Sequence, residues 1–239
     1  MKNIYEILLS LRTSLWLLFL ITLFFIAGAV IMPSYPEFSS IDIPLFKWLV
    51  QQPSGATWWL WGAVGLLGIL SVNTLFCSIE SIIKKRKVTQ WLLLISPQII
   101  HIGFIFILLA HLLGAVGSYH YKVAVAEGYQ VKISEGELLR VKNIDIQVDP
   151  QGYVNDWSLD LEYLSGGMVI DEDRIAPNKP SLHNSLNIIA KDVQPYPKAA
   201  LLQISKDPGA VWALAGSILF ITGILTLIVL KIRIEKITV

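Results

Sequence analysis

The sequence predicts an integral membrane protein, α-helical with four transmembrane helices, that carries a small extracytoplasmic all-β domain between helices three and four. Of the 239 residues, 54% are hydrophobic and 15% are charged, whereas a soluble domain usually carries about 25% charged residues. This composition argues against a soluble enzyme, and a net charge of +1 gives no indication of nucleic-acid binding. The order of apolar and alternating segments along the chain supplies the rest of the prediction.

Four apolar segments are long enough to cross the hydrocarbon core, which takes roughly 20 residues in a helix. The expected helices cover residues 13–32, 58–78, 91–116 and 209–230. The third exceeds what a bilayer needs and contains Pro97, so it is expected to tilt or to kink there. The first is too long for a signal-peptide core and is expected to be retained.

These helices divide the chain into three parts. Residues 1–117 hold three helices and a basic cytoplasmic loop at 79–90, residues 118–208 form the β domain, and residues 209–239 hold the fourth helix. Nine basic and three acidic residues flank the helices on the side of the termini, whereas residues 118–208 carry nine basic and thirteen acidic residues. By the positive-inside rule, both termini are expected in the cytoplasm and the β domain outside the cytoplasmic (inner) membrane.

The segment 118–208 is expected to form a small antiparallel sheet or sandwich. Short runs rich in β-branched and aromatic residues lie between glycine-containing turns, and several alternate with a period of two. By this alternation, Val141 and Asn143 fall on the face opposite to Ile144. The acidic run 171–173 is expected in a solvated turn. The expected strands are 119–125, 129–133, 141–148, 157–163, 186–190 and 201–204.

The β domain is expected to dock and position other molecules, without catalytic chemistry of its own. It contains no cysteine, and His120 and His183 stand 63 positions apart with no metal-ligand spacing around them. Both are expected to be ordinary surface histidines. Cys77, the single cysteine of the chain, excludes an intrachain disulfide and a CxxC redox site. It is expected to fill space as a small apolar residue at a helix end.

Two histidines of the third helix are the candidate binding residues. His101 lies about 15 Å along the axis from Trp91, and His111 about 15 Å further, at about 1.5 Å per residue. Their rings point about 80° apart, so they cannot share one small ion, but each could ligate its own haem iron. The alternative for each is a neutral imidazole that hydrogen-bonds to a neighbouring helix or to water. Asn73 is likewise expected to hydrogen-bond to a neighbouring helix.

A haem held at His101 would need an opposite ligand from a second chain. The other three expected helices contain no histidine, and no methionine lies deep within them. A self-contained b-type cytochrome uses pairs of axial ligands on facing helices. The distribution of ligands therefore favours a subunit of a complex over a complete electron carrier.

Four stretches of the chain resemble the ResB-type cytochrome c biogenesis proteins of System II. They are SLRTSLW at 10–16, the segment 91–117 with HIGF at 101–104, IAPNKP at 175–180, and KDPG at 206–209. The resemblance covers the whole chain, including the external domain between the third and fourth spans. The order of these stretches and the topology carry it together.

The resemblance implies a haem lyase (cytochrome c synthase) subunit that is not catalytic alone. With a ResC/CcsA-type partner it would move haem b across the lipid bilayer for covalent attachment to the reduced CxxCH thiols of apocytochrome c. A thiol-reducing thioredoxin-like protein is a further expected partner. His101 matches the family's transmembrane haem-ligating histidine, and His111 is the second choice; no catalytic residue is assigned. Many family members have a larger external domain, so docking functions carried by the additional part are not transferred to this chain.

Two other classes of function remain open. The chain could be a membrane electron-transfer subunit that shares a haem with a cytochrome b-like partner and exchanges electrons with quinol. It could also be an assembly scaffold whose histidines are structural. The run 58–61 (WWLW) does not distinguish these classes, because tryptophan is enriched at membrane interfaces and the run is expected to be an aromatic anchor there.

Overall fold

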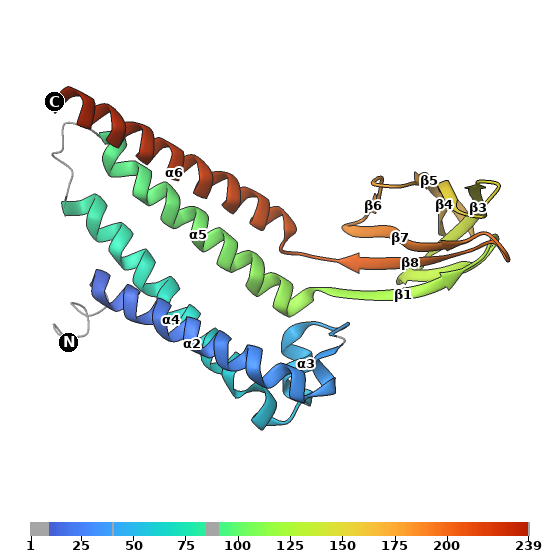
Figure 1. The fold of residues 1–239 in the computed structure, drawn as a ribbon, viewed down its shortest axis with the longest axis horizontal. Coiled ribbons are helices and arrows are strands. Elements are labelled where there is room, and N and C mark those ends of the chain that lie inside the picture. Colours follow the sequence, from blue (N-terminus) through green and yellow to red (C-terminus); the bar gives the residue numbers. More distant parts are fainter. Residues whose placement is uncertain (1–9, 40, 85–90, 239) are drawn as a thin grey trace. The chain divides into compact units, whose positions relative to one another are not determined.

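The computed structural model describes residues 10–39, 41–84 and 91–238 (Figure 1). Four helices in this part of the chain are long and apolar enough to cross a membrane, as expected. They are α2 (Leu11–Ile31), α4 (Ser54–Lys84), α5 (Trp91–Gly117) and α6 (Ala210–Thr238). Helix α4 begins four residues before the expected span and continues to Lys84, so residues 79–84 of the expected basic loop are helical. Residues 85–90 of that loop lie outside the described residues.

Helices α2 and α4 are joined by short helical segments and a small aromatic cluster. The connection contains η1 (Met32–Ser34), η2 (Pro36–Ser39) and α3 (Leu45–Gln51). Phe38 lies with its ring centroid 4.8 Å from that of the buried Trp48, and it also contacts Trp59. Within the WWLW run, Trp58 and Trp61 are exposed as an interfacial anchor requires, but Trp59 is buried by this packing.

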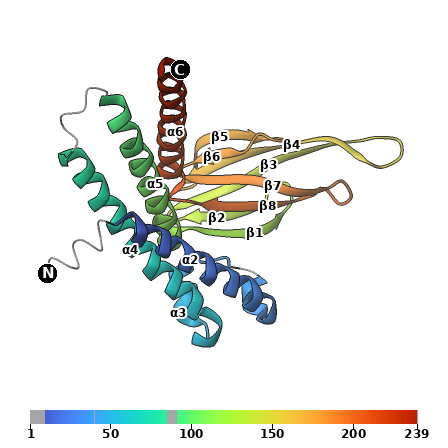
Figure 2. The same cartoon turned by 60° about the vertical axis from the view of Figure 1, so that its left-hand side comes forward.

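The four long helices pack as two pairs through glycine, α2 with α4 and α5 with α6 (Figures 1 and 2). A Cβ atom built on Gly28 of α2 would lie 2.5 Å from the Trp59 ring of α4. A Cβ atom on Gly103 of α5 would lie 2.6 Å from the backbone nitrogen of Phe220 on α6. Small residues allow helix backbones to approach closely where no hydrophobic effect drives association. Glycine at these positions is therefore a requirement of packing.

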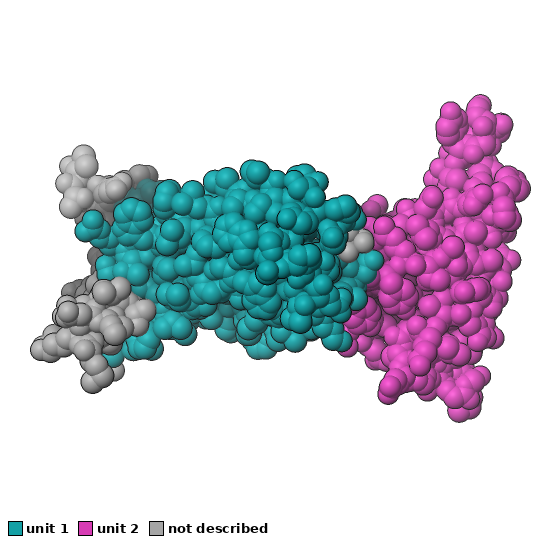
Figure 3. Space-filling model, turned by 90° about the horizontal axis from the view of Figure 1, so that it is seen from below, with its two compact units in different colours: residues 1–116, 208–239 teal, residues 117–207 magenta. Residues whose placement is uncertain are grey.

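Residues 117–207 form a separate compact unit, coloured magenta in Figure 3. It is an all-β domain of two four-stranded antiparallel sheets, with the strand orders β1-β8-β7-β6 and β2-β3-β4-β5 (Figure 2). The strands are β1 (Tyr119–Val125), β2 (Gln130–Ser134), β3 (Glu137–Val148), β4 (Val154–Ser165), β5 (Met168–Ile175), β6 (Ser181–His183), β7 (Leu186–Gln194) and β8 (Ala199–Lys206).

One hydrophobic core lies between the two sheets and contains residues from both. On β4 its fully buried members alternate along the strand, as Leu159, Leu161 and Tyr163 show. On β3 the alternation changes phase, because the pairing with β4 shifts between Val141 and Asn143. This bulge buries both Val141 and Ile144, which the sequence alternation had placed on opposite faces.

Two strands were not expected from the sequence, and both are edge strands. The acidic run 171–173 lies within β5 and pairs with β4, so its interpretation as a solvated turn is wrong. The side chains of β5 are mostly exposed, which hides the apolar alternation that reveals the other strands. Strand β6 contains only three residues, too few for a periodic signal. His183 lies on β6, and Asp171 of β5 is one of its contacts.

Candidate functional site: a histidine-lined cavity among the helices

A cavity of about 880 Å³, here called the helix cavity, lies among the four long helices. Pockets that hold drug-sized ligands occupy about 300–1,000 Å³. Its residues come from the first halves of α2 and α5, the second half of α4 and one position on α6. The lining is mainly apolar and consists of Leu11, Ser14, Leu18, Leu70, Asn73, Thr74, Cys77, Glu80, Ser81, Leu93, Pro97, Gln98, Ile100, His101, Phe104 and Phe220.

His101 lies in the wall of this cavity and is fixed by a hydrogen bond to another helix. Its Nδ1 atom lies 2.7 Å from the hydroxyl oxygen of Ser78 on α4. Ser78 is buried and the His101 ring is half-buried. An imidazole has two nitrogens in different directions, so Nε2 is available to a metal when the ring proton is on Nδ1 and is donated to Ser78.

The hydrogen bond expected for Asn73 is present. The hydroxyl of Ser14 on α2 donates to Asn73 Oδ1 on α4 at 2.5 Å, and Asn73 is fully buried. Gln98, one turn before His101 on α5, is also buried, but its Oε1 has no hydrogen-bond partner in the described part of the chain. A buried amide oxygen without a partner is costly and is normally satisfied by water or by a ligand. Gln98 thus adds a polar group that a molecule in the cavity could satisfy.

The structure brings Cys77 to the same cavity as His101 but leaves His111 outside its lining. His111 is exposed on α5, ten residues further along, so the two candidate histidines do not form one site. Cys77 fills part of the cavity wall on α4, next to Ser78. Among the described residues that line the cavity, His101 contributes the one imidazole and Cys77 the one thiol.

The residues of the helix cavity fit haem as a ligand. The macrocycle needs an apolar slot, which the leucine, isoleucine and phenylalanine side chains supply. Its iron would need a nitrogen ligand, which Nε2 of His101 would supply when Nδ1 carries the ring proton and donates it to Ser78. Among the described lining residues, His101 is the one histidine and Cys77 the one cysteine, and none is a methionine, so these two side chains are the candidates for binding iron. A haem bound here would provide a redox-active iron whose potential depends on that ligation.

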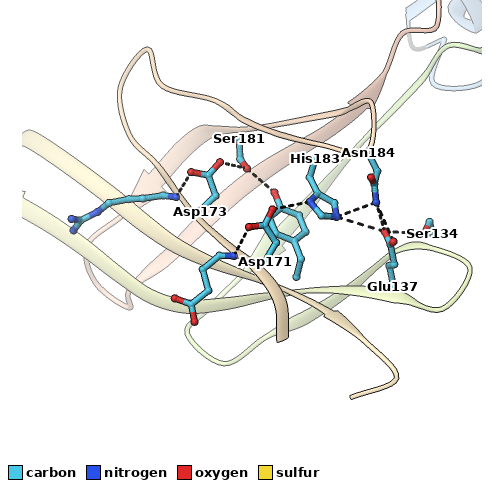
Figure 4. Close-up of polar contacts among 10 residues, drawn as sticks. Ser134, Glu137, Asp171, Asp173, Ser181, His183 and Asn184 are labelled. Carbon is cyan, nitrogen blue, oxygen red and sulfur yellow. Dashed lines mark hydrogen bonds and ion pairs between the residues drawn. The ribbon is translucent and has the colours of Figure 1, made fainter. Parts of the chain in front are cut away.

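His183 belongs to a polar cluster that joins the two sheets of the β domain (Figure 4). Its ring, 10% exposed, stacks on Tyr163 of β4 with centroids 3.8 Å apart. Its Nδ1 lies 3.3 Å from Asp171 of β5, and its Nε2 lies 3.2 Å from the Asn184 amide, which donates to Glu137. The expectation of an ordinary surface histidine is therefore wrong for His183. His120 lies apart from this cluster, on β1 opposite Ser205.

The same cluster holds the Tyr163 hydroxyl in the protein interior. It lies 2.6 Å from Ser181 Oγ, and Ser181 donates to Asp173 Oδ2 at 2.5 Å. Burial raises the pKa of Tyr163 to about 12, so the phenol stays neutral. Although carboxylates and a histidine meet here, the described residues contain no group of three histidine, cysteine or acidic side chains arranged to hold a metal ion. The cluster is a structural clamp between β4, β5 and β6.

Reasoning from the sequence missed two residues that matter for His101: Ser78, which hydrogen-bonds to its ring, and Gln98, which lines the cavity beside it. Ser78 belongs to a polar face of α4, since positions 74, 78 and 81 recur at helical spacing and so share one side. Gln98 stands three residues before His101, and this spacing places both on one face of α5. Helical spacing relative to His101 was therefore a usable signal for Gln98. The pairing of Ser78 with His101 required the fold.

Comparisons with known proteins do not identify a family for this chain. No protein-family model and no curated protein sequence matches it. A solved structure described as "Cytochrome c Heme Lyase CcmF" superposes with a TM-score of 0.48 at 12% sequence identity, over 91% of this chain and 34% of that chain. The chain thus spans about a third of the length of that protein, and a likeness at this level establishes neither a common fold nor a shared activity.

Proposed function

We propose that this chain is a membrane-embedded haem-handling subunit of cytochrome c biogenesis, of the ResB type. The observation that carries the proposal is His101 in the wall of a mainly apolar cavity with its Nδ1 bonded to Ser78. This is the arrangement of an imidazole prepared to ligate a metal through its other nitrogen. The resemblance of four sequence stretches to ResB proteins supports the same assignment.

Haem is the cargo in this proposal, and the chain's residues bind and orient it. His101 supplies one axial nitrogen, and the opposite ligand comes from a histidine of a ResC/CcsA-type partner. The cavity lies at the ends of α2, α4 and α5 that the positive-inside rule assigns to the cytoplasmic half of the membrane. That position suits a site that receives haem from the cytoplasmic side before attachment to apocytochrome c on the outer face.

The proposed topology places both termini in the cytoplasm and the β domain outside the inner membrane. The β domain then serves as a docking and positioning element without catalytic chemistry of its own. The topology can be tested in whole cells with single-cysteine variants at exposed positions such as Tyr153 and Tyr196. In these variants the native cysteine is removed by Cys77→Ser. Labelling by a membrane-impermeant maleimide is expected at both positions. Protection of both until the membrane is permeabilised would contradict the topology.

The test of the haem site uses the chain co-expressed and purified with a ResC/CcsA-type partner. The wild-type pair is expected to show a haem absorption spectrum, and His101→Ala to lose or weaken it, with partial recovery in added imidazole. His111→Ala, on the same helix but outside the cavity, is the matched control and is expected to retain the spectrum. An unchanged spectrum in His101→Ala would refute the site.

A second measurement separates the classes of function. Haem that leaves the pair as a covalent adduct of apocytochrome c supports synthesis. Haem that stays bound and cycles its redox state with quinol would identify an electron-transfer subunit instead. A pair that assembles fully without haem would identify a scaffold.

A further inference from the structure

Ser78 differs from the hydroxyl residues around it. Ser71 and Thr74 on α4 donate to the carbonyl oxygens of the residues four positions earlier, both at 2.8 Å, and Ser96 on α5 does so at 2.7 Å. Such bonds satisfy a hydroxyl within its own helix and need no further explanation. The hydroxyl of Ser78 instead reaches Nδ1 of His101 on another helix. Its partner is the residue proposed to bind iron.

The direction of this hydrogen bond decides what His101 can bind. A neutral imidazole carries one N–H and one lone pair, and a serine hydroxyl can either donate or accept. If Ser78 donates, the ring proton sits on Nε2 and blocks that nitrogen. If Ser78 accepts the Nδ1 proton, Nε2 presents its lone pair. Metal-bound histidines almost always donate their second N–H to a fixed acceptor, which orients the ring and raises its basicity.

We propose that Ser78 is a positioning residue for haem ligation: its Oγ accepts the Nδ1 proton of His101 and so holds Nε2 as the iron-binding nitrogen. The inference rests on the proposed function and deepens it. A more basic ring donates more electron density to iron and favours the ferric state. Ser78 thereby lowers the reduction potential of the haem as well as fixing the ring.

The experiment uses the chain purified with its partner, haem as the probe, and three variants of Ser78. Ser78→Ala removes the acceptor, Ser78→Cys keeps the size with a weak acceptor, and Ser78→Thr restores a hydroxyl. Ser71→Ala is the control, because it removes a hydroxyl from the same helix outside the cavity lining. The readouts are the haem-to-protein ratio, the visible spectrum and the midpoint potential from a redox titration.

Ser78→Ala and Ser78→Cys are expected to weaken haem binding roughly 10- to 100-fold and to move the midpoint potential to more positive values. Ser78→Thr and Ser71→Ala are expected to behave as wild type. A purely structural role would alter yield but not the potential of the haem that remains. If Ser78→Ala or the less disruptive Ser78→Cys keeps the wild-type potential and spectrum, the inference is overturned. If His101→Ala keeps its haem, the proposed function itself fails, which separates the two outcomes.

Discussion

The hydroxyl oxygen of Ser78 lies 2.7 Å from Nδ1 of His101, and this bond joins two helix pairs that are each packed through glycine. One pair is α2 with α4 and the other is α5 with α6. Phe104 of α5 also reaches the apolar cluster of Leu17, Ile21 and Leu70 on the first pair. The helix cavity lies where the pairs meet, so the packing within each pair fixes the walls of the candidate site.

The first prediction concerns the glycine contact between α5 and α6. Gly103→Ala is expected to destabilise the helices by about 1–3 kcal/mol, because the added methyl group meets the Gly216 and Phe220 backbone, which cannot move aside as a flexible side chain would. Gly65→Ala on α4 is the control, since nothing lies within 4 Å of its Cβ position. Thermal unfolding in detergent measures both. Equal stability of the two variants would show that the close approach is not required.

The second prediction concerns Cys77, the thiol that shares the cavity with His101. If the opposite axial ligand comes from the partner, Cys77→Ala is expected to leave the haem spectrum and the haem content of the purified pair unchanged. Loss of the haem spectrum with normal assembly would instead show that the thiol ligates iron, and that the chain supplies both ligands. Absorption spectroscopy of the ferric and ferrous states distinguishes these results.

The sequence predicted most of the helices and strands because their apolar residues recur with a clear period. The four spans and six of the eight strands were found in this way. Strand β5 was missed because an exposed edge strand has no buried face, and its acidic run imitates a turn. On β3, the bulge between Val141 and Asn143 changes the buried face, and a fixed period of two cannot represent that shift.

For the candidate site, the sequence identified His101 from its type and its depth in a helix. It did not find the acceptor at Nδ1, because Ser78 is 23 positions away and the two residues meet only when α4 and α5 pack. The same limit applies to His183. His183 lies on β6, and its contacts Asp171, Glu137 and Tyr163 lie on three different strands of the other sheet, β5, β3 and β4. Long-range pairs of this kind carry no local signal.

The third prediction tests the polar clamp between the sheets. Tyr163→Phe keeps the ring that stacks on His183 but removes the hydroxyl that meets Ser181 in a buried site. Ser181 keeps its bond to Asp173, so the variant loses one buried hydrogen bond, which contributes about 0.5–1.5 kcal/mol, and the β domain is expected to open more readily. Hydrogen exchange measured by mass spectrometry in the full-length protein should show faster exchange in β4, β5 and β6, with unchanged protection in the helices. Uniformly unchanged exchange in those three strands would contradict the clamp.

The fourth prediction separates the acidic run of β5 from haem binding. Simultaneous replacement of Asp171, Glu172 and Asp173 by alanine is expected to leave the haem content of the purified pair intact, since all three residues belong to the β domain. The β domain itself is expected to lose stability, because Asp171 contacts His183 and Asp173 accepts from Ser181. Glu172→Ala alone, which removes only an exposed contact with Lys142, is the milder control. Loss of haem without loss of assembly would place this run in the haem site.

The last prediction concerns acid denaturation of the β domain. A hydrogen bond from Lys142, the larger cause, and one from Arg140 lower the pKa of Glu162 below its usual value of 4.5. A carboxyl group with a depressed pKa in the folded state stabilises the fold above its unfolded pKa, and this contribution is lost as the pH falls through the folded pKa. The stabilisation by Glu162 is therefore complete near neutral pH and disappears below pH 4.5.

Glu162→Gln removes this titration while keeping the size of a side chain that is 5% exposed. The variant is expected to be less stable than wild type at pH 7, because it weakens the contacts with Arg140 and Lys142. Since the glutamine does not titrate, the gap between the two proteins should stay constant from pH 7 to pH 5 and narrow below pH 4.5. Urea unfolding followed by near-ultraviolet circular dichroism of the full-length protein measures the gap. A gap that widens on acidification would mean that the carboxylate destabilises the folded domain, contrary to its position between two cations.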